Sequence, residues 1–280
     1  MPMILAKRKL SRLLLYALLI ALGCVWILPV VFMLFTAMKS PADLFGSSSL
    51  FSIPKKIEWA NFVNAWSQGK MSLYMGNSLI ISAVKVPLGI FIASLAAFAL
   101  TKMNFKWSNS AFIFFLLGMM IPVQVTLVPL NIMLTKSGLI NTRTGLIIVY
   151  IGFGLSFAIL ILRGFFRTIP KELDDAAKID GCSNWGLFWR IIMPIAMPAV
   201  ATLVILDFLS TWNEFLLAQI FITSDQLRTV PTGLMSFKGQ FSTNYGLMNA
   251  GVLISVIPIF AVYLLFQKYF VQGLAGSVKG

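Results

Sequence analysis

Six long apolar runs dominate this 280-residue chain, and they restrict its fold more than any other feature. The hydrocarbon core of a bilayer is about 30 Å thick and needs roughly 20 predominantly apolar residues per helix. Each run reaches about that length. We therefore expect six membrane-spanning helices, at about residues 13–38, 77–101, 110–135, 144–162, 194–223 and 245–267. The predicted fold class is an all-α membrane protein with a single transmembrane domain over residues 1–280.

The composition excludes most other classes of protein. Apolar residues make up 59% of the chain and charged residues 11%, whereas soluble domains average about 45–50% and about 25%. The net charge of +13 would indicate nucleic-acid binding in a soluble protein, but here the bases lie between apolar runs. The absence of His and the presence of only two Cys exclude His-based catalysis and His/Cys zinc sites. We expect a lipid-embedded protein with no nucleic-acid partner and no metal site.

The distribution of Lys and Arg predicts the orientation. An even number of spans places both termini on one side, where 13 basic residues lie against 8 on the other. A tight basic cluster, residues 7–12, precedes the first apolar run. The positive-inside rule therefore predicts that both termini are cytoplasmic.

Residues 163–193 form the longest expected cytoplasmic connection, and their pattern indicates structure. Pro170 suits a first helical turn, and Gly181 stands where a helix would end in the left-handed conformation. The helix dipole favours the acidic residues that follow the proline, which are Glu172, Asp174 and Asp175. We expect a short helix that ends at Gly181.

One face of this helix carries mostly small side chains, which would let another protein approach closely. Its members recur at i, i+3, i+4 and i+7: Leu173, Ala176, Ala177 and Asp180. Ser183 can cap a second short helix, residues 184–192, which Pro194 would end and in which Phe188 adds apolar surface. The spacing alone leaves two interpretations open, a docking element or a solvated amphipathic loop.

The same segment resembles the EAA loop of ATP-binding-cassette (ABC) importer permeases. The residues that carry the resemblance are Asp175-Ala176-Ala177-Lys178-Ile179-Asp180-Gly181, then Phe188, Ile191, Met193-Pro194 and Pro198. Asp175 replaces the usual Glu of that motif and Met193 replaces the usual Leu. Residues 212–215 and the end of the chain, 267–280, are similar to the maltose-type carbohydrate permeases.

The resemblance implies a permease subunit of an ATP-driven, binding-protein-dependent importer for sugars or oligosaccharides, in a bacterial or archaeal cytoplasmic membrane. Implied partners are a second homologous permease, two ATPase subunits and an extracytoplasmic solute-binding protein. The implied coupling residues, which would engage an ATPase subunit, are Glu172, Asp174, Asp175, Ala176, Ala177, Asp180, Gly181, Phe188 and Pro194.

The chain itself carries no phosphate-binding loop. Gly69-Lys70 is followed by Met71 instead of Ser or Thr, and Asn64 stands where the first glycine should be. We therefore expect ATP and Mg²⁺ to bind the ATPase partner, with no cofactor and no enzymatic activity in this chain.

Three charged residues fall inside the predicted spans, and one of them has an asparagine beside it. Lys85 lies in span 77–101, and Asp207, Asn213 and Glu214 lie in span 194–223. A charge in hydrocarbon costs at least about 2.5–3.5 kcal/mol, so such residues usually face the bundle interior or water. Two interpretations stay open: a hydrophilic translocation pathway, or an ion pair and a capping interaction that position helices.

The remaining expectation concerns the outer loop, residues 224–243. By resemblance this loop would contact the solute-binding protein, through Arg228, Phe237 and Gln240, although it also fits a simple connector.

A rival hypothesis for the whole chain is an ion-coupled secondary transporter that uses the intramembrane charges. That class predicts inverted internal repeats, and the sequence shows no convincing repeat.

Overall fold

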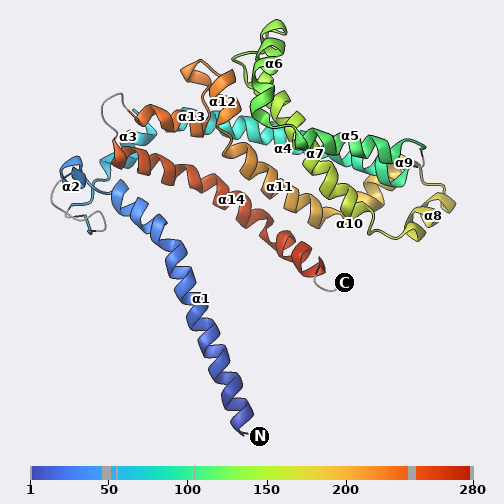
Figure 1. Ribbon diagram of the computed structural model, residues 1–280, viewed down its shortest axis with the longest axis horizontal. Coiled ribbons are helices and arrows are strands. Elements are labelled where there is room, and N and C mark those ends of the chain that lie inside the picture. Colours follow the sequence, from blue (N-terminus) through green and yellow to red (C-terminus); the bar gives the residue numbers. More distant parts are fainter. Residues whose placement is uncertain (1, 46–51, 55, 104, 239–243, 278–280) are drawn as a thin grey trace. The chain divides into compact units, whose positions relative to one another are not determined.

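The computed structural model describes residues 2–45, 52–54, 56–103, 105–238 and 244–277, and its regular elements are helices (Figure 1). The predicted all-α fold class is confirmed. Within the described residues, four helices are long and apolar enough to cross a membrane: Arg12–Ala37, Met71–Lys102, Arg143–Phe166 and Tyr245–Tyr269. Two bent helix pairs raise the number to six if each pair is one span.

The chain divides into two compact units. The first comprises residues 1–71 and 236–254, and the second comprises residues 72–235 and 255–280. The first unit contains α1 (Pro2–Ala37), α2 (Pro41–Phe45), α3 (Ala60–Trp66) and the start of α14 (Tyr245–Ser277). Asn61 of α3 donates hydrogen bonds to the carbonyl oxygens of Ala37 and Lys39, at 2.9 and 3.0 Å, and so ties α3 to the end of α1.

The second unit contains the long helices that surround the candidate site. They are α4 (Met71–Lys102, from its second residue), α5 (Ser108–Met120), α6 (Val123–Lys136), α7 (Arg143–Phe166) and α11 (Met197–Trp212). Shorter elements connect them: α8 (Lys171–Ile179), α9 (Asn184–Leu187), the π-helical turn Phe188–Ile192, α10 (Met193–Ile195), α12 (Leu216–Phe221), the 3-10 turn Asp225–Leu227 and α13 (Val230–Leu234). A further 3-10 turn, Met235–Phe237, follows α13.

The core of the second unit lies where α4, α6, α7 and α12 meet. Its buried side chains are Ile81, Leu134, Leu146, Val149, Tyr150, Leu217, Ala218, Phe221 and Ile222. α5 and α11 each pack against α7 (Figure 1). In contrast, residues 12–22 of α1 are exposed, and Trp26 is 80% exposed. Such apolar exposure is expected of a helix that contacts lipid or another subunit.

The predicted span 110–135 is a bent pair of helices in the structure and not one continuous helix. α5 ends at Met120, α6 begins at Val123, and their axes are bent by 98°. The cause is Pro122, which lacks an N–H and forces the preceding residue out of the helical conformation. Ile121 and Pro122 are both extended, with ψ angles of 117° and 132°.

The predicted span 194–223 is also corrected, since it is not one helix. α11 ends at Trp212, and α12 begins three residues after Asn213. A bend of 75° separates α11 from the helical segment Asn184–Ile195 before it. After α11, the side chain of Glu214 binds the free N–H groups at the start of α12.

A close backbone approach at Gly145 gives a first testable prediction. A Cβ atom there would lie 2.2 Å from the carbonyl oxygen of Leu139, in the loop that enters α7. Because backbone cannot yield as a side chain does, Gly145→Ala should lower the free energy of unfolding by about 1–3 kcal/mol. Gly152→Ala in the same helix is the control, since nothing lies within 4 Å of its Cβ position. Unfolding midpoints in detergent measure the difference, and equal midpoints would contradict the packing described.

Candidate functional site

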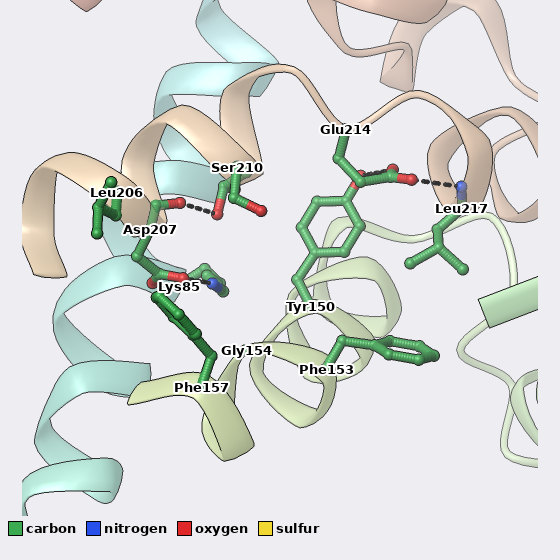
Figure 2. Close-up of a pocket in the computed structure, with 11 residues that line it drawn as sticks. Lys85, Tyr150, Phe153, Gly154, Phe157, Leu206, Asp207, Ser210, Glu214 and Leu217 are labelled. Carbon is green, nitrogen blue, oxygen red and sulfur yellow. Dashed lines mark hydrogen bonds and ion pairs between the residues drawn. The ribbon is translucent and has the colours of Figure 1, made fainter. Parts of the chain in front are cut away.

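A cavity that contains several polar side chains lies among α4, α7 and α11 of the second unit (Figure 2). It has a volume of about 370 Å³, and its lining residues are Lys85, Tyr150, Phe153, Gly154, Phe157, Leu206, Asp207, Ser210, Thr211, Glu214 and Leu217. Three of the four predicted intramembrane residues, Lys85, Asp207 and Glu214, line it. Asn213 does not, because its exposed side chain donates to the carbonyl oxygen of Leu209 at 2.9 Å.

Lys85 and Asp207 form an ion pair in this cavity. Their side chains are 4% and 14% exposed, so the charges are largely removed from solvent. Gly154 allows α7 to pass close to the pair, since a Cβ there would lie 2.9 Å from Lys85 Nζ and 3.3 Å from Asp207 Oδ1. The pair joins α4 to α11 next to α7.

Glu214 acts as a cap for α12. Its carboxylate accepts hydrogen bonds from the backbone N–H groups of Leu217 and Ala218, at 2.7 and 3.0 Å. It also accepts one from the Tyr150 hydroxyl of α7 (Figure 2). Both open interpretations of these charges therefore have support: the side chains line a cavity, and they also position helices.

The Glu214 contacts predict a measurable loss of stability. Glu214→Ala removes a helix cap, typically about 0.5–2 kcal/mol, and leaves the buried Tyr150 hydroxyl without its acceptor, about 1–3 kcal/mol. We expect the unfolding midpoint in detergent to fall clearly below that of Asn213→Ala, the neighbouring control at an exposed position. Tyr150→Phe should show a smaller loss. An unfolding midpoint equal to that of the Asn213 control would refute the capping role.

α8 forms as the sequence predicted, with its ends slightly shifted. The helix begins at Lys171 instead of Pro170, which has an extended ψ of 140° and stands just before the first turn. Gly181 is in the left-handed conformation, with φ of +74°. Ser183 accepts a hydrogen bond from the Gly186 N–H at 3.2 Å, so it caps the next helix as expected.

The structure changes which face of α8 is available to another protein. Asp174 and Ala177 are buried against the rest of the chain. The exposed residues include Glu172, Leu173, Asp175, Ala176, Ile179, Asp180 and Gly181. Ile179 is 86% exposed, which is high for a large apolar side chain. Because Glu172, Ala176 and Ile179 are spaced four and three residues apart, they share one outward face, which we call the α8 surface.

The predicted small-residue face is therefore corrected at Ala177, which turns inward. Phe188 is also buried, with 0% exposure, and its ring packs 5.3 Å from that of Phe98, centroid to centroid. Phe188 is therefore not part of an exposed docking surface.

The second short helix does not end at Pro194 as predicted. α9 passes into the π-helical turn Phe188–Ile192, and Pro194 lies inside α10, which ends at Ile195. In the π-helical turn the Met193 N–H bonds to the carbonyl oxygen of Phe188. Pro194 is tolerated at the start of a helical segment because its missing N–H is not needed there.

The sequence did not predict how α8 is attached. Lys102, the last residue of α4, forms an ion pair with Asp174 at 2.8 Å and donates to the carbonyl oxygen of Ile169 at 3.1 Å. The sequence also did not predict that Tyr150 and Gly154 line the cavity, because both lie within an uninterrupted apolar run. Contacts across 60 or more residues leave no signal in local spacing.

The outer-loop residues fall in different environments. Arg228 pairs weakly with Asp225, at 3.5 Å, and its carbonyl oxygen accepts a hydrogen bond from Asn77 of α4 at 2.8 Å. Phe237 is buried, in the first unit, where its ring occupies the space beside Gly69. This corrects its predicted role as a contact residue. Gln240 lies outside the described residues.

These features define a multi-pass helical membrane permease with a short surface helix. Residues 85–276 match the family described as binding-protein-dependent transport system inner membrane component, and the chain belongs to that family. It is 41% identical over 253 residues to the probable ABC transporter permease protein YurM of Bacillus subtilis, which covers 90% of this chain and 83% of the relative.

Two further comparisons agree. The chain is 32% identical over 253 residues to the sulfoquinovosyl glycerol transport system permease protein SmoH of Agrobacterium fabrum, covering 90% and 88% of the two chains. Its fold matches that of a bacterial ABC transporter involved in alginate import, with a TM-score of 0.81, 19% identity and coverage of 94% and 97%. The predicted resemblance to ABC-importer permeases is confirmed, and it replaces the rival hypothesis of a secondary transporter.

Proposed function

We propose that this chain is one of two permease subunits in an ATP-driven importer of neutral saccharides. A second homologous permease would complete the pathway, two ATPase subunits would bind ATP and Mg²⁺, and an extracytoplasmic binding protein would deliver the saccharide. The supporting observation is the α8 surface. Glu172, Ala176 and Ile179 leave an apolar centre exposed on a short helix whose opposite face is anchored to α4. Such a surface suits docking into a partner.

The names of relatives support the saccharide class. They include permeases for starch degradation products in Thermoanaerobacterium thermosulfurigenes, for diacetylchitobiose in Streptomyces coelicolor and for arabinooligosaccharides in Halalkalibacterium halodurans. The cavity favours a neutral cargo over an anionic one. Among the described residues that line it, Lys85 is the one cation, and Asp207 already balances that charge.

The orientation proposal places α8 and both termini in the cytoplasm. It rests on the excess of Lys and Arg on that side. The two ends of α4 support it as well. Lys102 contacts α8 at one end, whereas Asn77, near the other end, contacts the loop that carries Arg228. The 25-residue step from Asn77 to Lys102 in α4 corresponds to about 38 Å, enough to separate these contacts across a bilayer core of about 30 Å.

The substrate class is tested with the purified complex of both permeases and two ATPase subunits in nanodiscs. ATP hydrolysis is measured with the binding protein and, in turn, maltotriose, arabinotriose, diacetylchitobiose or an alginate trisaccharide. We expect one of the neutral saccharides to stimulate hydrolysis several-fold and the acidic one to leave it at the unstimulated rate. Stimulation by the alginate trisaccharide alone would contradict a neutral cargo.

A further inference from the structure

We infer that Lys102 is a positioning residue for transport: its buried ion pair with Asp174 fixes α8 to the end of α4, so that α8 and α4 move together. The inference rests on the proposed function, because it concerns how an ATPase docked on α8 would act on the membrane helices. The Nζ–Oδ2 distance is 2.8 Å, and the two side chains are 3% and 9% exposed.

Few other attachments hold α8 to the described residues of the chain. Of its nine residues, Asp174 and Ala177 are buried. A methyl group such as that of Ala177 contributes little contact area, so the carboxylate of Asp174 is the main anchor. Its second oxygen, Oδ1, is buried and has no hydrogen-bond partner in the described part of the chain. The anchor therefore depends on the contact of Oδ2 with Lys102.

Lys102 also holds the segment that leads into α8. Its ammonium donates to the carbonyl oxygen of Ile169, two residues before α8 begins. Ile169 is itself 4% exposed. One ammonium group thus contacts both the entry segment and the first turn of α8, which fixes the direction of the helix as well as its position.

The energetics favour a positioning role over a purely stabilising one. A buried ion pair adds little net stability, because desolvation of the two charges offsets their attraction. Removal of one partner leaves an uncompensated buried charge, and the structure responds by moving or hydrating it. In α8, which has little else to anchor it, the expected response is a displaced helix and not an unfolded chain.

α4 carries further polar attachments, so it links α8 to distant parts of the second unit. Lys85 pairs with Asp207 of α11 beside the cavity. Near the start of α4, Tyr74 donates to Asp225 at 3.0 Å, and Asn77 contacts the carbonyl oxygens of Gln226 and Arg228. α4 is continuous from Met71 to Lys102, with Pro87 inside it, and a packed helix is an element of the kind that can carry coupling between sites. α4 therefore connects the outer loop, the cavity and α8.

The test compares Lys102→Met with Lys106→Met in the nanodisc complex. Lys106 is an exposed lysine four residues further along and is the matched control. The readout is the ratio of ATP hydrolysis with the loaded binding protein to hydrolysis without it, using the saccharide that stimulates the wild type. We expect Lys102→Met to lower this ratio at least about fivefold, the lower end of usual coupling energies. Lys106→Met should match the wild type.

Two more variants separate positioning from a general loss of structure. Lys102→Arg keeps the charge and should retain most of the stimulation. In the double variant Lys102→Met/Asp174→Asn the loss should not exceed that of Lys102→Met alone, because the two residues act as one pair. Additive losses, or full stimulation in an assembled Lys102→Met complex, would overturn the inference. If Lys102→Met does not assemble, Lys102→Arg decides: stimulation retained supports the inference, and stimulation lost contradicts it.

The outcomes also distinguish this inference from the proposed function. A wild-type complex that does not respond to any loaded binding protein would contradict the proposed function. A wild-type response that Lys102→Met leaves unchanged would contradict only the role of Lys102.

Discussion

Replacing Lys85 with methionine, while Asp207 stays, is expected to destabilise the protein severely. The carboxylate of Asp207 would remain in the cavity wall without its partner, at 14% exposure and among apolar helices. Breaking a buried ion pair by removing one partner costs about 3–5 kcal/mol. We expect a strongly lowered unfolding midpoint in detergent and a reduced yield of inserted protein.

The matched control removes both charges. Lys85→Met/Asp207→Leu replaces the pair by apolar side chains, which is often neutral or stabilising at buried positions. Its unfolding midpoint should return close to the wild-type value. An unfolding midpoint of Lys85→Met equal to that of the wild type would show that Lys85 does not stabilise Asp207 in the cavity as the structure indicates.

The second large effect is expected at the α8 surface. Ala176→Arg places a long charged side chain at the centre of that surface, directed away from Asp174 and Ala177, so the chain itself should fold normally. Loss of a central contact typically costs an interface about 2 kcal/mol or more, which exceeds a tenfold loss of affinity. Co-purification of the ATPase subunit with the tagged permease, at wild-type expression, measures the loss.

Thr168→Arg is the control for that variant. Thr168 is exposed, lies just before α8 and receives the same new side chain. We expect it to keep the ATPase subunit. A bulky residue at Ala177 would not serve the same purpose, because Ala177 is 5% exposed and the change would disturb packing within the chain. Equal recovery of the ATPase with Ala176→Arg and Thr168→Arg would show that α8 does not dock it.

Apolar run length predicted the helical regions because a membrane helix needs about 20 apolar residues, whatever surrounds it. It did not predict where helices break. Pro122 interrupts a run that composition alone presents as continuous. α11 ends at Trp212 and Glu214 then caps α12, a break within a run that apolar composition also presents as continuous.

The part of the candidate site that local sequence determines was predictable, and the part that long-range contacts determine was not. Local cues were sufficient for α8: the acidic first turn, the left-handed Gly181 and the Ser183 cap all lie within a few residues of it. Which face of α8 is exposed was not predictable, since it depends on Lys102, 72 residues before Asp174. The Tyr150–Glu214 contact is long-range in the same way.

The driving force for uptake is the most direct test of the claim that this chain is a permease subunit of an ATP-driven importer. Proteoliposomes that contain the complex, with the loaded binding protein outside and ATP inside, are assayed for accumulation of radiolabelled saccharide. We predict accumulation that requires internal ATP and the ATPase subunits, and none when a proton or sodium gradient replaces ATP. Gradient-driven uptake by the permease chain without any ATPase subunit would contradict the account.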